Sequence, residues 1–269
     1  MVKKLLRHEF LYYIRNFSLF LPIILVVGIM TRVFRFLDNG SILTEIAVGS
    51  SVIMLWVSCM ALMLLSTAAA VVRFYKNMYT AEGYLTFTLP VSNAQHIFVK
   101  LLVAVVCQAI CLLTVVLSVV IAASGEPLAE FFLLMGEAFG ELSPVVGLNM
   151  IVYALEFLLI LILAAASNML LFYACITIGQ LAKKNRILLA IGAYFIYYVG
   201  TQVLSTILSI LFAIFSMTPL IDALFTWAFL FPVLAIHIYL GVFLLFSAGL
   251  VALFFFITHR IMTKRLNLE

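Results

Sequence analysis

Charged residues are scarce in this sequence. Lys, Arg, Asp and Glu make up 10% of its 269 residues, whereas a soluble domain carries roughly 25%. Hydrophobic residues make up 67% and the mean hydropathy is +1.29, and a soluble protein cannot bury so large an apolar share. This balance excludes a water-soluble enzyme. It also excludes a nucleic-acid-binding protein, which carries dense positive charge, and a disordered chain, which has low hydrophobicity. It predicts a protein whose solvent is a lipid bilayer.

Motifs that carry chemistry are also missing. The chain has no GxxxxGK[ST] phosphate loop and no CxxC pair, so it has neither the nucleotide-binding loop of an ATPase nor the usual spacing of a metal or haem site. His8-Glu9 lacks the second histidine of a zinc protease. Cys107 and Cys111 are four residues apart within an apolar run, where a disulfide is geometrically unfavourable. We therefore expect no catalytic residue, metal site or bound cofactor in this chain.

Long apolar runs are abundant, and six of them can cross a membrane. A crossing helix needs about 20 mostly apolar residues, and a helix satisfies its own backbone hydrogen bonds within the hydrocarbon. The sequence therefore predicts an all-α integral membrane protein with a single transmembrane domain over residues 1–269. The predicted spans are Phe17 to Phe34, Ile46 to Val72, Ile97 to Ala123, a part of Val145 to Ala182, a part of Ile187 to Phe215, and a part of Phe231 to Ile257.

The few charges support this count. Of the 15 basic residues, all but Arg32 and Arg35 fall in the N-terminus, the loop between spans 2 and 3, the loop between spans 4 and 5, or the C-terminus. With six spans these four segments share one side, and basic residues mark the cytoplasmic side. We therefore expect a multi-pass protein of the cell membrane with both termini in the cytoplasm.

Two apolar stretches are longer than one crossing requires. They are Val145 to Ala182 and Pro219 to Ile257. The surplus could form a tilted extension, an interfacial helix or a re-entrant hairpin. We favour interfacial or re-entrant pieces near Val145 to Leu155 and Leu220 to Val233.

Two cytoplasmic segments are patterned. Residues 1–16 predict a basic amphipathic helix along the inner leaflet, which could serve as an anchor to anionic lipid, as a partner contact, or as both. In the loop over residues 73–95, Thr80 can cap one or two helical turns, Pro90 ends them, and Ser92 with Gln95 forms a capping box for span 3. Geometry alone leaves an ordinary ordered loop and a helix that receives force from a soluble motor equally open.

This loop resembles a segment of known transporters. Phe74-Tyr75-Lys76-Asn77 and the run from Glu82 to Ser92, Glu-Gly-Tyr-Leu-Thr-Phe-Thr-Leu-Pro-Val-Ser, are similar to the loop after span 2 in permease subunits of ABC-2-type transporters, chiefly of Gram-positive bacteria. The N-terminal Lys-Leu-Leu-Arg-His-Glu-Phe over residues 4–10 and Gly-Gln-Leu-Ala-Lys-Lys over residues 179–184 extend the likeness to about residue 190.

The resemblance implies an exporter in the bacterial cytoplasmic membrane, built from two permeases, identical or related, and two ATP-binding subunits. ATP and Mg would be bound by the partner subunits only, and no nucleic acid is involved. The substrate would be hydrophobic or amphipathic, such as an antimicrobial peptide, a drug or a lipid. The resemblance also implies a coupling helix seated in a cleft of the ATPase, formed by Tyr79, Thr80, Ala81, Glu82, Gly83, Tyr84 and Leu85.

A different function is suggested by two polar residues near the ends of spans. Glu156 is an acidic residue within a long apolar run, and His237 lies near the start of span 6. An ionisable residue inside a membrane is a functional candidate by default, although both positions are also compatible with the outer interface. The alternative hypothesis is an ion-coupled secondary transporter that uses Glu156 and His237; the lack of inverted repeats counts against it.

Overall fold

The computed structural model describes residues 2–80, 82–84, 88, 91–147, 149–182, 184–216 and 218–264. The described residues are almost entirely helical and contain no strand, as expected for a chain whose backbone must satisfy its own hydrogen bonds in lipid. The helices are α1 (Val2–Phe17), α2 (Phe20–Phe36), α3 (Ile42–Tyr79), α5 (Asn93–Ala123), α6 (Glu126–Val146), α7 (Asn149–Gly179), α8 (Arg186–Phe215), α9 (Pro219–Leu230) and α10 (Pro232–Lys264).

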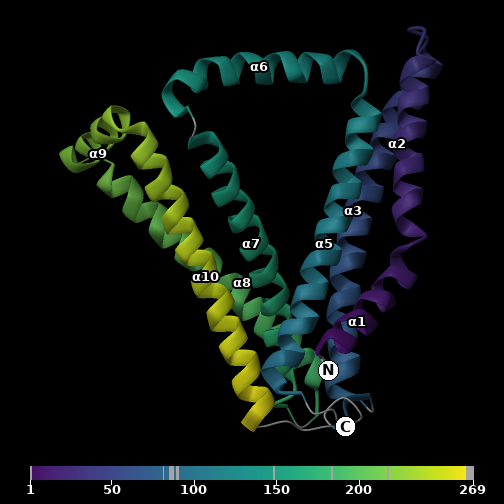
Figure 1. The fold of residues 1–269 in the computed structure, drawn as a ribbon, viewed down its shortest axis with the longest axis vertical. Coiled ribbons are helices and arrows are strands. Elements are labelled where there is room, and N and C mark those ends of the chain that lie inside the picture. The colour runs from purple at the N-terminus through teal and green to yellow at the C-terminus, as the bar shows by residue number, and fades with distance from the viewer. Residues whose placement is uncertain are drawn as a thin grey trace. The chain divides into compact units, whose positions relative to one another are not determined.

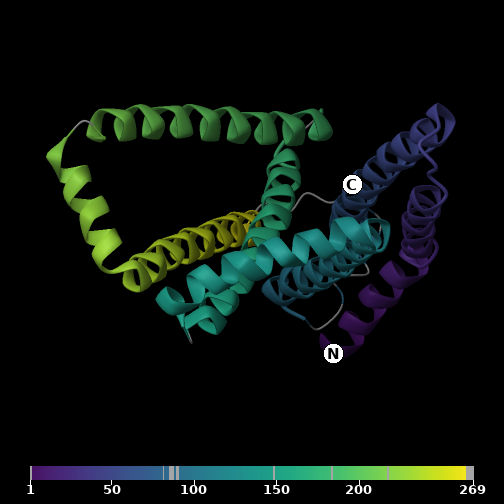
Figure 2. The ribbon, with the colours of Figure 1, turned by 90° about the horizontal axis from the view of Figure 1, so that it is seen from above.

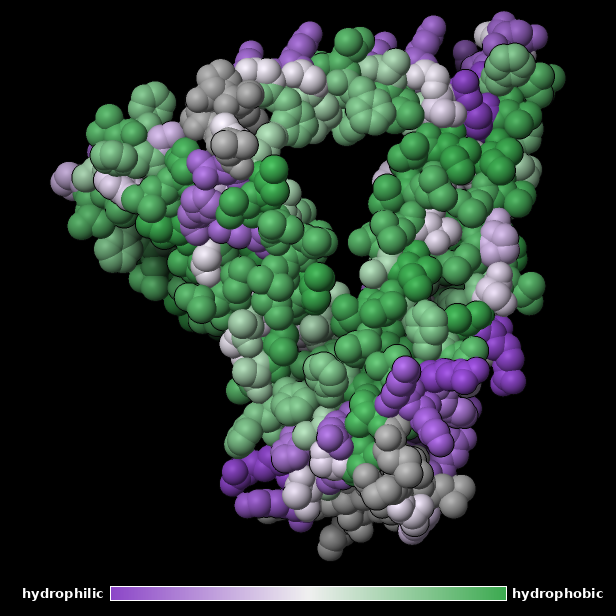
Figure 3. Space-filling model, viewed as in Figure 1, coloured by the Kyte–Doolittle hydropathy of each residue, from purple (hydrophilic) through white to green (hydrophobic). Residues whose placement is uncertain are grey.

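Five helices of the described residues, α3, α5, α7, α8 and α10, are long and apolar enough to cross a membrane. The 17-residue α2 counts as a sixth only when it is joined with α1 into one span bent by 41°. The predicted all-α membrane fold is therefore confirmed, with five or six candidate crossings in place of a fixed six. Hydrophilic side chains gather at the ends of the helices and apolar side chains occupy their middle (Figure 3).

The chain divides into two compact units. The first contains residues 1–78 and 85–139, and the second contains residues 79–84 and 140–269. In the first unit α2, α3 and α5 run side by side (Figure 1). Polar contacts join them: Thr31 Oγ1 donates to the Ser51 carbonyl over 3.3 Å, and Gln108 Nε2 donates to Thr67 Oγ1 over 3.3 Å.

A glycine sets the closest approach of α2 to α5. A Cβ atom at Gly28 would lie 2.5 Å from Ser118 Oγ and 2.7 Å from the Ser118 carbonyl oxygen. Ser118 Oγ also donates to the Ile24 carbonyl over 2.8 Å. Small residues allow helices in a membrane to pack this closely, so this contact fixes α2 against α5 with no room for a larger side chain.

The second unit is organised around α7, which packs chiefly against α10 and also against α8. Gly179, at the end of α7, meets the start of α8: a Cβ atom there would lie 2.6 Å from the Arg186 carbonyl oxygen and 2.7 Å from the Ala190 Cβ. The α9 helix joins the end of α8 to the start of α10 (Figure 2). Neither α8 nor α9 has a buried residue among the described residues.

The long apolar stretches break at other places than predicted. The expected separate piece at Val145 to Leu155 is wrong, because α7 begins at Asn149 and runs to Gly179 without a break. The surplus residues are part of this one 31-residue helix, as in the extension that the sequence left open. The α6 helix, which precedes α7, was not identified from the sequence. Four glutamates lie on one face of α6. At 100° per residue their positions fall within an arc of roughly 60° around the helix axis; they are Glu126, Glu130, Glu137 and Glu141. Hydrophilic side chains project from one edge of this helix (Figure 3).

The second expected break is confirmed as a separate element. Residues Pro219–Leu230 form the short helix α9, and α10 starts at Pro232. Proline at the first position of each helix supplies the fixed φ angle of a helix start and lacks an N–H that would have no partner there. The capping box at Ser92 is confirmed too, since Ser92 Oγ accepts from the Gln95 N–H and the Gln95 side chain accepts from the Ser92 N–H.

Candidate functional site: two charged clusters and a loop

A buried carboxylate lies at the point where three helices of the first unit meet. Glu9 of α1 is 2% exposed, and its Oε1 accepts from Lys100 Nζ over 2.8 Å and from Asn77 Nδ2 over 2.9 Å. Its Oε2 accepts from Arg73 Nε over 3.2 Å. We call Glu9, Arg73, Asn77 and Lys100 the Glu9 cluster. It ties α1 to the last two turns of α3 and the first turns of α5.

Local sequence spacing places these groups. Arg73 and Asn77 are four residues apart on α3, so their side chains lie on one face. Glu9 and Tyr13 are likewise one turn apart on the buried face of α1. Lys100 follows two turns after the Ser92 cap of α5. The three helices therefore present their polar groups at one level without any irregular backbone.

Two cations face one carboxylate in this cluster, and this decides the ionisation of Glu9. Burial acts to raise the Glu9 pKa, but attraction and hydrogen bonding from Lys100 and Arg73 outweigh it and hold the pKa below its ordinary value. Glu9 therefore stays ionised at neutral pH. Arg73 is further positioned by Tyr12, whose ring centroid lies 4.1 Å from the guanidinium carbon.

The predicted coupling segment lies directly after α3. Ala81 and Leu85 are outside the described residues, while Glu82, Gly83 and Tyr84 are helical and the Gly83 N–H donates to the Thr80 carbonyl over 2.7 Å. Glu82 and Tyr84 are exposed, Tyr84 by 53%, whereas Gly83 is buried. The segment thus presents two large polar side chains on its outer surface.

Tyr79, the first residue of this segment, has a large side chain that is buried. It is 1% exposed, and its hydroxyl lies 2.8 Å from Thr177 Oγ1 of α7. Thr177 Oγ1 donates to the Tyr173 carbonyl over 2.6 Å, so its only proton is used and Tyr79 is the donor. Residues 79–84 accordingly cluster with the second unit, whereas α3 and α5, which flank them in the chain, belong to the first.

The structure brings together the two polar residues that the sequence singled out in the spans. His237 Nδ1 of α10 lies 3.0 Å and 3.1 Å from the two carboxylate oxygens of Glu156 on α7. The two side chains are 27% and 26% exposed. The Tyr153 ring centroid lies 4.5 Å from that of His237, and its hydroxyl donates to the Val233 carbonyl over 3.1 Å. This Glu156–His237 pair links the first turns of α7 and α10.

Sequence reasoning found the Glu156–His237 pair as separate residues but missed the role of Glu9. It counted Arg73 and Lys100 only as cytoplasmic charges. The available signal was an acidic residue on the apolar face of an otherwise basic amphipathic helix, since a buried charge needs a partner.

No group of three or more His, Cys, Asp or Glu side chains that could hold a metal ion occurs among the described residues. The four cysteines are free thiols, three of them buried.

Comparison with protein-family models, with curated proteins and with solved structures gives no match to this chain. The likeness to ABC-2-type permeases stays a prediction from the motifs quoted above. The structure itself shows, among the described residues, five helices that are long and apolar enough to cross a membrane.

Proposed function

We propose that this chain is the membrane-spanning permease subunit of an ATP-driven exporter of the ABC-2 type. In this arrangement α2, α3, α5, α7, α8 and α10 cross the cytoplasmic membrane of a bacterium, both termini are cytoplasmic, and α1 lies along the inner leaflet. A separate subunit binds and hydrolyses ATP with Mg, and a second permease, identical or related, completes the pathway. The cargo is hydrophobic or amphipathic.

The observation that carries this proposal is the placement of residues 79–84. Glu82 and Tyr84 are exposed, while Tyr79 is hydrogen-bonded to Thr177 of α7. A soluble ATPase that grips the exposed side chains would therefore displace a segment anchored on α7. The Glu9 cluster supports the same scheme, because it braces the ends of α3 and α5, which hold this segment from either side.

The test is copurification with the ATPase encoded next to this chain. The wild-type chain is expected to copurify with a phosphate-loop ATPase, and Glu82→Ala with Tyr84→Ala to lose most of it while the membrane yield is unchanged. Glu45→Ala with Tyr239→Ala removes the same side-chain types at exposed positions outside the segment and should retain the partner. Equal retention by both double variants would overturn the coupling role. Copurification of no ATPase with wild type would overturn the exporter.

A second function is favoured by the Glu156–His237 pair, an ionisable pair at 3.0 Å within otherwise apolar helices. An ion-coupled secondary transporter would drive export from this pair without any ATPase. Proteoliposomes that contain only this chain, loaded with ethidium as an amphipathic probe, distinguish the two functions. Efflux driven by a proton gradient and lost in Glu156→Gln would favour the secondary transporter; no gradient-driven efflux would exclude it for this probe.

A further inference from the structure

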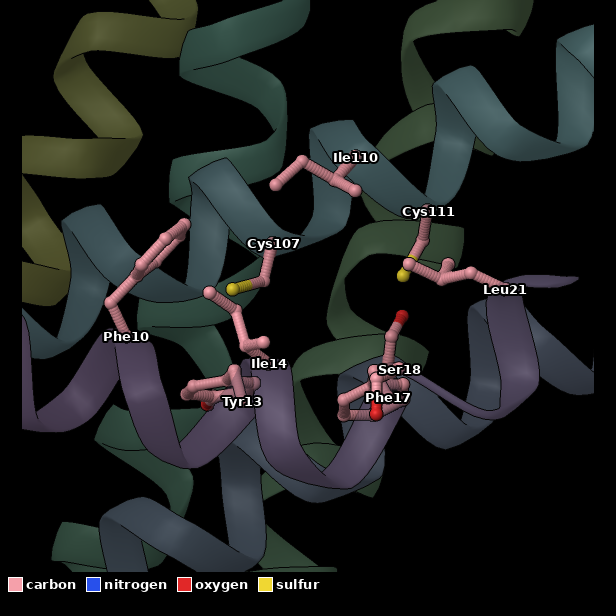
Figure 4. A pocket seen from close by; sticks show the side chains of 10 residues that line it. Phe10, Tyr13, Ile14, Phe17, Ser18, Leu21, Cys107, Ile110 and Cys111 are labelled. Carbon is pink, nitrogen blue, oxygen red and sulfur yellow. The ribbon is translucent and has the colours of Figure 1, made fainter.

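A cavity with apolar walls separates α1 from α5 in the first unit. It has a volume of about 180 Å³ and is lined by Phe10, Tyr13, Ile14, Phe17, Ser18, Leu21, Ser66, Cys107, Ile110 and Cys111. Figure 4 shows Ile14 of α1 and Ser18, which follows α1, pointing toward Cys107 and Cys111 of α5. These walls offer almost no hydrogen-bonding surface, so the cavity suits a hydrocarbon chain better than water.

Ile14 also lines a second and larger pocket. It has a volume of about 480 Å³ and is lined by His8, Leu11, Tyr12, Ile14, Arg15 and Arg73. Arg15 is exposed, and Arg73 is held in the pocket wall by its ion pair with Glu9 and its contact with the Tyr12 ring. Two guanidinium groups and an imidazole thus surround one space, which is the donor set that a phosphate group binds.

The two pockets are ordered along the helices as the parts of a phospholipid are. On α3, Arg73 lines the basic pocket and Ser66 lines the apolar cavity. Seven residues separate them, which is about 10 Å along the axis at 1.5 Å per residue. The apolar cavity therefore lies deeper into the apolar part of α3, by about two helical turns, and Ile14 borders both spaces.

We propose that these two pockets form one binding site for an anionic phospholipid of the inner leaflet. The headgroup phosphate occupies the basic pocket between Arg15 and Arg73, and one acyl chain passes Ile14 into the cavity beside Cys107. The bound lipid fills the gap between α1 and α5 and so fastens the amphipathic helix to the helix that follows the predicted coupling segment. This site is distinct from general attraction of a basic helix to the membrane, which needs no cavity.

The test measures binding of dioleoyl phosphatidylglycerol to the full chain in detergent, by native mass spectrometry and by the shift of Tm. Dioleoyl phosphatidylcholine supplies the same chains without net charge, and glycerol 1-phosphate supplies the phosphate without chains. We expect one saturable phosphatidylglycerol site per chain, weaker binding of phosphatidylcholine and no shift with glycerol 1-phosphate. A comparable shift with glycerol 1-phosphate, or equal binding of the two phospholipids, would overturn the proposal.

Variants separate the built site from diffuse attraction. Arg15→Gln should weaken phosphatidylglycerol binding about five-fold, the effect of one cation near an anionic surface. Lys4→Gln removes the same charge from α1 outside both pockets and should leave binding unchanged. Equal weakening by both variants would show attraction to the whole helix and would overturn the site.

The cavity has its own pair of variants. Cys107→Phe fills it and should abolish the saturable site, while Leu112→Phe adds bulk at a 45% exposed position of α5 outside the cavity and should keep it. Because Cys107→Phe could fail to fold, Ile110→Trp fills the cavity from a position that is 37% exposed. Unchanged binding in a folded cavity-filling variant would show that no acyl chain enters, and would overturn the proposal.

Discussion

The two units hold their charged groups in opposite ways. In the first unit, Glu9 is 2% exposed and accepts three hydrogen bonds from side chains of two other helices. In the second, Glu156 is 26% exposed and pairs with His237 over 3.0 Å. A fully buried carboxylate with several partners locks helices together, whereas a pair that is about a quarter exposed is held less firmly. The Glu9 cluster is therefore a structural anchor, whereas the Glu156–His237 pair is the better candidate for a functional site.

The largest expected effect is the removal of Glu9. Glu9→Ala removes the carboxylate from the buried Lys100 and from Arg73, which is 11% exposed, and breaking a buried pair in this way costs about 3–5 kcal/mol of stability. Thermal unfolding in detergent, followed by intrinsic fluorescence, measures the loss. Glu156→Ala in the second unit is the matched control and should cost much less; equal losses in the two variants would contradict the contrast between the units.

Acid should weaken the Glu9 cluster through the same carboxylate. The Glu9 pKa in the folded chain lies below its ordinary value of 4.5, because Lys100 and Arg73 outweigh the opposing effect of burial. The contribution of Glu9 to stability is therefore fully present well above pH 4.5 and is lost as the pH falls through the folded-state pKa. Tm should stay level from pH 8 to 6 and fall below about pH 4.5. In Glu9→Gln this part of the fall should be absent, and an unchanged pH profile would argue against the assignment.

Each unit contains a glycine at a close contact between two helices, and replacing either glycine should destabilise the protein to a similar extent. A Cβ atom at Gly28 or at Gly179 would lie within 2.7 Å of a backbone oxygen of a neighbouring helix, and such overpacking costs about 1–3 kcal/mol. Gly28→Ala and Gly179→Ala should therefore lower Tm to a similar extent. Gly192→Ala, where a Cβ meets nothing within 4 Å, is the control. A loss confined to one unit would show that the other unit can adjust its helices.

Much of this fold could be predicted from the sequence. Apolar length identified the spanning segments, and the capping box placed the start of α5 at Asn93. The α6 helix was missed, although the spacing of its four glutamates puts them on one helix face. The break before α7 was misplaced because an apolar run does not show where one helix ends and the next begins.

The sites were predictable only in part, for the same reason. Glu156 and His237 were identified separately, but their sequence separation of 81 residues carries no sign of contact, and only the packing of α7 on α10 joins them. Glu9 was hidden because its partners lie on α3 and α5 and were explained as cytoplasmic charges. Patterns within one helix predict its faces; which faces meet is decided by tertiary packing.

The smallest effect on stability is expected at the Glu156–His237 pair. The same variant also gives the sharpest test of the contrast between this pair and the Glu9 cluster. Glu156→Gln keeps the shape and one acceptor oxygen, and a pair about a quarter exposed contributes only about 0–1 kcal/mol, so Tm should hardly change. If the pair carries the coupling ion, ethidium efflux driven by a proton gradient is lost in the same variant. If the chain is an ATP-driven permease, that efflux is absent from wild type too, and the pair serves only to join α7 to α10. A large fall in Tm would instead place Glu156 with Glu9 as an anchor.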